Sequence, residues 1–185
     1  MRLGFFTMPM HPIGKDWSQS RAEDREAFLL ADELGFTEGY CGEHTTDPEE
    51  NITSSAMFIA SLASATKRIR RGTGTVNMPN HHPVQTAATL AMLDHLLGGR
   101  FNFGISPGAL PSDAEALGNM DMDRPAMFLE AINTVLAIWQ GGPPYDIAGQ
   151  YWNVSTARSR PPSRPSRKAS PKPPRAAGTR SRRTS

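Results

Sequence analysis

The sequence contains little cysteine and no long hydrophobic run. Cys41 is the only cysteine among 185 residues, which excludes a disulfide framework within the chain and is typical of a reducing compartment. No segment approaches the roughly 20 apolar residues that a transmembrane helix needs. The apolar run at the N-terminus is too short and too early for a secretory signal peptide. These absences predict a soluble, cytoplasmic protein.

Acidic residues are missing from the C-terminal end. Residues 157–185 hold half of the 20 Lys and Arg residues and none of the 18 Asp and Glu residues, so the net charge of +2 averages an acidic body and a basic tail. The hydrophobic side chains of this tail are four alanines, too few to offset the entropy that the chain loses on ordering. We therefore expect a folded part over residues 1–156 and a disordered Arg/Pro/Ser-rich tail over 157–185.

Three interpretations of the tail stay open. Clustered Arg and Lys residues can bind nucleic acid or another acidic surface by displacing counterions. The tail has no interleaved aromatic side chains, so nucleic acid is the weaker expectation. A proline-rich segment can also be an extended, solvated linker. A frameshift near Thr156 would instead replace a folded continuation by out-of-frame Arg, Ser, Pro and Ala codons.

Strands and helices alternate along residues 1–156. Apolar and β-branched runs predict strands over 2–7, 36–42, 69–77 and 100–106. Helical spacing predicts helices from Ser20, in a capping box with Glu23, to Gly35, and over 54–66, 83–97 and 123–141, with a closing hairpin around Gly149. This order favours parallel strands covered by helices, an α/β fold, and both a doubly wound sheet and a barrel satisfy it.

Several short motifs follow one another in a fixed order along residues 1–154. They are Gly35-Phe36 through Tyr40, Glu43-His44, Gly72-Thr73-Gly74-Thr75-Val76, His82-Pro83-Val84, Leu93-Asp94, and Gly99-Arg100-Phe101 to Gly104-Ile105. In this order and spacing they resemble the bacterial luciferase-like flavin monooxygenase family. The N-terminal MRLGFFTMPMHP and the loop ISPGALPSD are similar to its limonene-monooxygenase-like branch.

The resemblance implies a TIM-type (β/α)8 barrel that binds reduced FMN and uses dioxygen to oxygenate a small organic substrate, terpene-like in the limonene branch. A separate NAD(P)H:flavin reductase would supply the reduced FMN. A full barrel needs eight strands and about 250 residues, so about four βα units make a partial barrel, its N-terminal half. The absence of the other four βα units favours the frameshift interpretation of the tail. By resemblance, the later strands would carry most of the flavin phosphate site.

The candidate site residues lie where predicted strands end. Parallel α/β barrels carry their chemistry at the C-terminal ends of the strands, which here bear His44, then Thr75 and Asn77, then Ser106. His44 can exchange protons near neutral pH, and the resemblance places this histidine beside the flavin. The alternative is a hydrogen-bonded histidine without a catalytic role. Glu43 would orient His44, face the substrate, or pair with an arginine.

The resemblance also assigns flavin contacts. Gly74-Thr75 corresponds to a non-proline cis peptide under the flavin ring, with an ordinary strand as the alternative. Asn77 lies beside it, and Ser106 stands where luciferase has a reactive cysteine, so its hydroxyl would hydrogen-bond the ring. Luciferase has an arginine where this sequence has Pro107, so the same contact to the flavin phosphate is not expected here.

Metal binding is not expected, because His44, His81 and His82 lack zinc-ligand spacing and a fourth partner. Arg70-Arg71 place two charges in a strand that should be buried, which counts against activity of this chain.

Two other functions stay open. One is a deazaflavin F420-dependent dehydrogenase of the same superfamily, which transfers hydride without oxygen. The other is a non-catalytic fragment or a binding module that acts through its basic tail. The apolar helix over 54–66 is typical of a subunit interface, so the complete fold is expected to form a homodimer.

Overall fold

A computed structural model of the protein describes residues 1–156. The basic tail and its three interpretations fall on residues 157–185, outside the described residues. Four parallel strands form one sheet in the order β1 (Gly4–Thr7), β2 (Glu38–Cys41), β3 (Arg70–Thr73) and β5 (Phe101–Asn102). The short strands β4 (Val76–Asn77) and β6 (Ile105–Ser106) follow β3 and β5 and pair in parallel with each other. The predicted parallel α/β order is confirmed.

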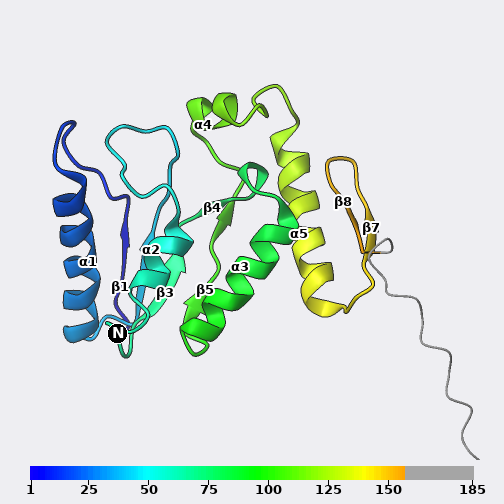
Figure 1. The fold of residues 1–185 in the computed structure, drawn as a ribbon. Coiled ribbons are helices and arrows are strands. Elements are labelled where there is room, and N and C mark those ends of the chain that lie inside the picture. Colours follow the sequence, from blue (N-terminus) through cyan, green and yellow to red (C-terminus); the bar gives the residue numbers. More distant parts are fainter. Residues whose placement is uncertain (157–185) are drawn as a thin grey trace, which may run out of the picture.

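Helices follow the strands in turn (Figure 1). They are α1 (Trp17–Glu33), α2 (Ser55–Ser61), the 3-10 turn η1 (Met78–Asn80), α3 (Pro83–Leu96), α4 (Pro111–Ala116) and α5 (Arg124–Gln140). An antiparallel hairpin of β7 (Asp146–Ala148) and β8 (Asn153–Ser155) closes the described part, as predicted. Because neighbouring strands follow chain order, successive right-handed crossovers place the helices on one face of the sheet. Within residues 1–156, no helix has the length and apolar character to cross a membrane.

The hydrophobic core lies between the sheet and this helical layer. One cluster joins β2, α1 and α2, and in it the Phe28 ring packs edge-on against Phe5, 4.8 Å between centroids, and against Phe58. Gly39 leaves room for these rings, since a Cβ there would lie 2.7 Å from Phe5. A second cluster joins α2, α3 and α5 around Ile59, Leu90, Leu93 and Val135. Cys41 belongs to the first cluster, where burial raises the pKa of its thiol, so it packs as a small hydrophobic residue.

One local prediction is wrong. Helix α1 begins one turn before the predicted capping box, because Asp16 is the N-cap and accepts a hydrogen bond from the Gln19 amide, 2.9 Å. Ser20 is therefore a buried residue inside the helix. The helix also holds His11, whose Nε2 lies 3.0 Å from Asp24 Oδ1.

The third and fourth predicted strands are each observed as two short strands. The peptide between Gly74 and Thr75 is cis, as the resemblance implied. At this break the Thr73 hydroxyl replaces backbone pairing: it donates to the Gly104 carbonyl (2.7 Å) and accepts from the Gly104 amide (2.9 Å). Backbone pairing resumes beyond the break, where the Val76 amide donates to the same carbonyl, 2.9 Å.

The two arginines that interrupt the third predicted strand have different surroundings. Arg70 donates to the Asn102 side chain and to two β5-side carbonyls, of Gly99 and Phe101. Arg71 is fully buried and donates to the Leu62 carbonyl at 2.9 Å. Burial lowers the pKa of Arg71 to about 10. Hydrogen bonds therefore compensate the charge of Arg70, whereas Nε and Nη2 of the buried Arg71 have no hydrogen-bond partner within residues 1–156.

Asp32 at the end of α1 organises the chain that leads into β3. Its carboxylate accepts from the amides of Lys67, Arg68 and Ile69 at 2.7–2.8 Å. Burial opposes ionisation, but these backbone hydrogen bonds hold the pKa of Asp32 below its ordinary value. The folded state therefore stabilises the ionised carboxylate.

We predict that Asp32→Asn lowers the free energy of unfolding by about 2 to 3 kcal/mol at pH 7, because the amide cannot accept all three hydrogen bonds. A carboxyl with a depressed folded-state pKa stabilises the fold above its unfolded-state pKa of about 3.9 and loses this contribution as the pH falls through the folded-state value. Urea unfolding should therefore show a smaller difference at pH 3. The matched control is Glu33→Gln, on the neighbouring exposed acid, which should change stability by less than about 0.5 kcal/mol.

Candidate active site

The residues predicted to contact flavin form one hydrogen-bonded chain. Strands β4 and β6 pair in a register that sets Asn77 opposite Ser106. The Thr75 hydroxyl donates to Ser106 Oγ at 2.7 Å, and Ser106 donates to Asn77 Oδ1 at 2.8 Å. Ser106 Oγ also accepts from the Gly108 amide, 3.1 Å. The two predicted strand ends therefore meet at one edge, as the sequence suggested.

Asn77 connects this chain to the end of β2, because its amide group donates to the Glu43 carbonyl at 3.5 Å. Gly74 lies just before Thr75, and a Cβ on Gly74 would lie 2.8 Å from the Phe6 ring and 3.1 Å from Tyr40 Cβ. The absence of a side chain at Gly74 therefore lets β3 approach two aromatic residues closely.

His44 pairs with a residue that the sequence did not indicate. Its Nδ1 lies 2.9 Å from Asp113 Oδ2. The other Asp113 oxygen accepts from the amides of Thr45 and Thr46, at 3.0 and 2.9 Å, and from the Thr46 hydroxyl. Although burial opposes ionisation, the hydrogen bonds from His44, Thr46 and Thr45 hold the pKa of Asp113 below its ordinary value. An ionised carboxylate only accepts, so His44 Nδ1 carries the hydrogen and Nε2 is left to act on a ligand.

Asp113 stands in the first turn of α4, a helix that the sequence analysis missed. Pro111 at the first helical position and an acid two residues later are a helix-start signal that could have indicated it. The pairing itself joins residues 69 positions apart, and no local pattern predicts it.

Glu43 does not orient His44 and does not pair with an arginine. Its Oε2 accepts from the Ser55 amide (2.9 Å) and hydroxyl (2.6 Å) at the start of α2, and its Oε1 lies 3.1 Å from His81 Nε2. Burial opposes ionisation, but the bonds from His81 and Ser55 lower the pKa of Glu43. Glu43 and Cys41 both lie on the helix side of β2, because alternate residues of an extended chain face opposite ways. Glu43 therefore stabilises the site from the helix side of the sheet.

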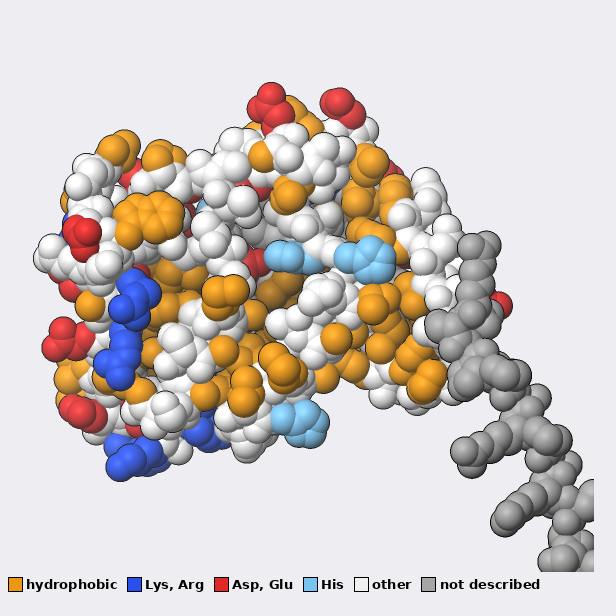
Figure 2. Space-filling model, in the orientation of Figure 1, with side chains coloured by type: hydrophobic (Ala, Val, Ile, Leu, Met, Phe, Trp, Pro, Cys, Tyr) orange, Lys and Arg blue, Asp and Glu red, His pale blue; other side chains and the backbone are white. Residues whose placement is uncertain are grey.

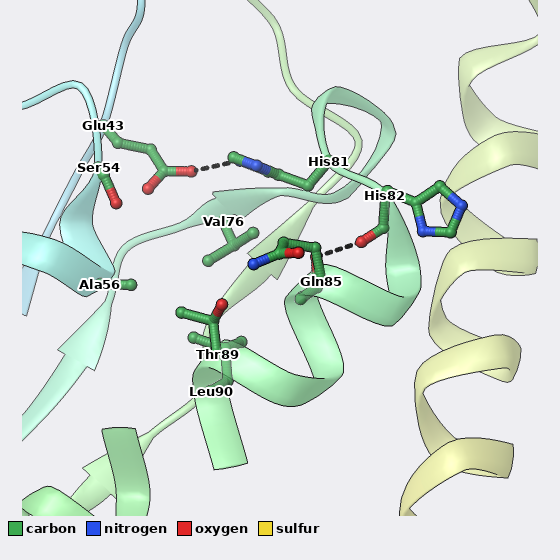
Figure 3. Close-up of a pocket in the computed structure, with 10 residues that line it drawn as sticks. Glu43, Ser54, Ala56, Val76, His81, His82, Gln85, Thr89 and Leu90 are labelled. Carbon is green, nitrogen blue, oxygen red and sulfur yellow. Dashed lines mark hydrogen bonds and ion pairs between the residues drawn. The ribbon is translucent and has the colours of Figure 1, made fainter. Parts of the chain in front are cut away.

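A cavity of about 170 Å³ lies beside the Glu43–His81 pair. Figure 3 shows that Gln85, Thr89 and Leu90 of α3 form one wall and that Glu43 and His81 face each other across its upper end. His82 caps α3 by accepting from the Val84 amide, as expected of a helix-start residue. Within residues 1–156, no group of His, Cys, Asp and Glu is arranged to hold a metal ion.

Arg124 fixes the loop that follows β6. Its guanidinium donates to the Pro107 carbonyl at 2.7 Å and to the side chains of Asn80 and Asn119. Gly108 in this loop has φ +77°, and a Cβ there would clash with Arg124. Residue 124 lies at the start of the helix predicted over 123–141, and no sequence pattern indicated this contact.

Comparison with known proteins places these features in a family context. The family model described as luciferase-like monooxygenase matches residues 1–184. The chain is 36% identical over 155 residues to 4-hydroxyprotoasukamycin monooxygenase of Streptomyces nodosus subsp. asukaensis, covering 84% of this chain and 42% of that protein. It is 38% identical over 138 residues to limonene 1,2-monooxygenase of Rhodococcus erythropolis, covering 75% of this chain and 36% of that protein. It is 31% identical over 165 residues to the oxygenase component of flavin-dependent trigonelline monooxygenase of Acinetobacter baylyi, covering 87% of this chain and 45% of that protein.

A solved structure shows the same partial coverage. The FMN complex of the oxygenating constituent of 3,6-diketocamphane monooxygenase of Pseudomonas putida superposes with a TM-score of 0.80 at 26% identity, over 84% of this chain and 43% of that chain. The chain thus spans less than half the length of these relatives. The fold is the partial α/β barrel that the sequence predicted.

We predict that Asp113→Asn reverses the preferred tautomer of His44. The Thr45 and Thr46 donors keep the amide oxygen on their side, so the NH2 group of the asparagine faces Nδ1, which must then accept, and the ring favours the Nε2–H form. Nitrogen-15 NMR of the imidazole, recorded above the titration range of the ring, reports the tautomer directly. Asp121→Asn, on an exposed acid, is the control and should leave the ring signals in place. An unchanged Nδ1–H tautomer in Asp113→Asn would show that Asp113 does not set the orientation of His44.

Proposed function

Since this chain belongs to the luciferase-like monooxygenase family, we propose that it forms the N-terminal half of a flavin-dependent monooxygenase. In the proposed reaction reduced FMN and dioxygen oxygenate a small organic substrate. The relatives named for limonene and 3,6-diketocamphane support a terpene-like substrate class. Because the chain spans less than half of its relatives, this activity is proposed for a protein that also carries the remaining βα units.

The chain of Thr75, Ser106 and Asn77 is the observation that carries this proposal. Two hydroxyls and one primary amide lie within hydrogen-bond distance of one another. This set offers uncharged donors and acceptors, which match the N–H and C=O groups along the edge of an isoalloxazine ring. The residues present therefore fit the ring of FMN. When bound, reduced FMN would supply the reaction with dioxygen.

His44 has the geometry of a proton-exchanging group in this site. Asp113 holds Nδ1, so a proton can move only at Nε2. Glu43 and Asn77 fix the backbone before His44, since the Asn77 amide group bonds to the Glu43 carbonyl. The proposed roles are thus His44 for proton exchange, Thr75, Asn77 and Ser106 for the ring, with Gly74 beside it, and Glu43 for support.

Two partners belong to the proposal. The relative named as an oxygenase component supports a separate NAD(P)H:flavin reductase that delivers reduced FMN. A homodimer is proposed through the helical face that carries the exposed apolar residues Met57 of α2 and Met92 and Leu96 of α3. Figure 2 shows hydrophobic side chains gathered over this face.

We predict that the 185-residue chain binds FMN and that Asn77→Leu weakens binding about tenfold, the effect of losing roughly 1.4 kcal/mol of hydrogen bonding. Titration of FMN and of reduced FMN under anaerobic conditions, followed by calorimetry, measures this. Asn133→Leu, on the exposed side of α5, is the matched control and should bind like the unmodified chain. Equal affinity of Asn77→Leu and Asn133→Leu would contradict the assigned ring contact.

The same titration with deazaflavin F420 separates the two cofactors. Binding of F420 and not of FMN would favour hydride transfer and contradict the proposed monooxygenase. With a flavin reductase and NADH present, oxygen consumption that rises on addition of a longer protein carrying this half is the expected result for a monooxygenase.

A further inference from the structure

The guanidinium of Arg71 is buried where β3 packs against α2. Arg71 is the largest fully buried side chain of the described part of the chain. Its Nη1 donates to the carbonyl of Leu62, the C-cap residue of α2, at 2.9 Å. Its Nε and Nη2 have no hydrogen-bond partner within residues 1–156. One side of this charged group is therefore bonded and the other side is not.

The two unpaired nitrogens form one edge of the guanidinium. In this planar group the Nε–H bond and one N–H bond of Nη2 run parallel, and such an edge binds a carboxylate or a phosphate through two hydrogen bonds. Burying a charged donor without an acceptor is costly, because the hydration that it loses is not replaced. One acceptor in front of the edge would bond to both nitrogens of Arg71 at once.

A second arginine lies beside Arg71. The Arg71 amide donates to the Arg100 carbonyl at 3.0 Å. The Arg100 guanidinium donates to the backbone carbonyls of Thr66, Ile69 and Leu97. Neither arginine forms an ion pair with an acid in the part of the chain that the structure describes. Asp32 lies within electrostatic reach of Arg71, but its carboxylate already accepts from three backbone amides. Positive charge therefore exceeds negative charge around Arg71.

This excess charge selects the kind of ligand that fits the edge. Burial and the charge of Arg100 lower the pKa of Arg71 to about 10, so its guanidinium keeps its proton at neutral pH. Water would accept the hydrogen bonds and leave the charge unbalanced, whereas an anion supplies both. The ligand of a fully buried group has to be small, and the residues that flank Leu62, Ser61 and Ala63, have small side chains. These surroundings favour a single-atom anion over a phosphate or a carboxylate.

We propose that the Nε–Nη2 edge of Arg71 is a buried chloride site that fastens β3 to the end of α2. The ion accepts one hydrogen bond from each of the two nitrogens, while Nη1 stays bonded to the Leu62 carbonyl. Strand β3 ends at Thr73, whose hydroxyl bonds to Gly104, and leads on to Thr75. The ion thus holds, from the helix side, the strand that leads to the candidate active site. This inference does not depend on flavin, and it gives a structural role to a charge in a strand that should be buried.

Thermal unfolding of the 185-residue chain at pH 7 and constant ionic strength tests the site in solution. A ligand that binds only the folded state stabilises it by mass action, so replacing sodium gluconate by sodium chloride should raise the melting temperature by about 5 °C. Arg71→Leu should remove this response, because leucine has no donors. Arg21→Leu, on an exposed arginine of α1, is the matched control and should keep it. Equal responses in the two variants, or no response in the unmodified chain, overturn the proposal.

Diffraction with bromide locates the ion directly in the unmodified chain. Crystals grown with sodium bromide in place of sodium chloride should show an anomalous peak in front of Nε and Nη2 of Arg71. Ordered water without anomalous scattering at this position contradicts the proposal. If Arg71→Leu does not fold, Arg71→Lys takes its place, because lysine keeps the charge and lacks the two-donor edge. A chloride response that persists undiminished in Arg71→Lys counts against the edge as the binding site.

Discussion

The hydrogen bonds between the Thr73 hydroxyl and Gly104 are the contact on which the candidate site depends. Backbone pairing of the sheet stops here, and one side chain fills both positions that a backbone amide and carbonyl would occupy. Gly104 must lack a side chain, because a Cβ would clash with the Thr73 carbonyl oxygen. With the break bridged in this way, β4 and β6 pair again further along and set Asn77 beside Ser106.

Carboxylates that accept backbone amides organise the loops around this sheet. Asp32, Asp113 and Glu130 each accept two or more backbone amides from a segment distant in sequence, and for Glu130 these belong to the tip of the closing hairpin. An ionised carboxylate that gains several N–H donors recovers the solvation it loses on burial. This arrangement gives fixed conformations to loops that contribute few hydrophobic contacts. Glu50, in the loop between β2 and α2, differs from these acids because its buried Oε2 has no hydrogen-bond partner within residues 1–156, and burial raises the pKa of its carboxyl.

Much of the fold could be predicted from local patterns. Apolar runs, glycine stops and the proline at Pro83 located the strands and helices, because these signals depend on neighbours along the chain. The start of α1 was wrong because Asp16 and Ser20 are both good caps, and the choice between them depends on tertiary burial of Ser20. The partners of His44 and Glu43 could not be predicted, because Asp113 and His81 reach them from elements 69 and 38 residues away. The placement of Asn77 beside Ser106 could be predicted, because parallel strands end at a common edge.

The separation of Glu43 from His44 follows from the alternation of β2. Gly39 and Cys41 face the helices, where Phe5 and Phe28 pack, while Glu38 and Tyr40 face the other side and bond to each other. Continuing this alternation past the end of the strand sends Glu43 toward α2 and His44 to the opposite side. Two adjacent polar residues therefore do different work. Glu43 joins the start of α2 to His81, and His44 bonds to Asp113 of α4. Substituting one residue of the pair consequently acts on a different layer of the protein from substituting the other.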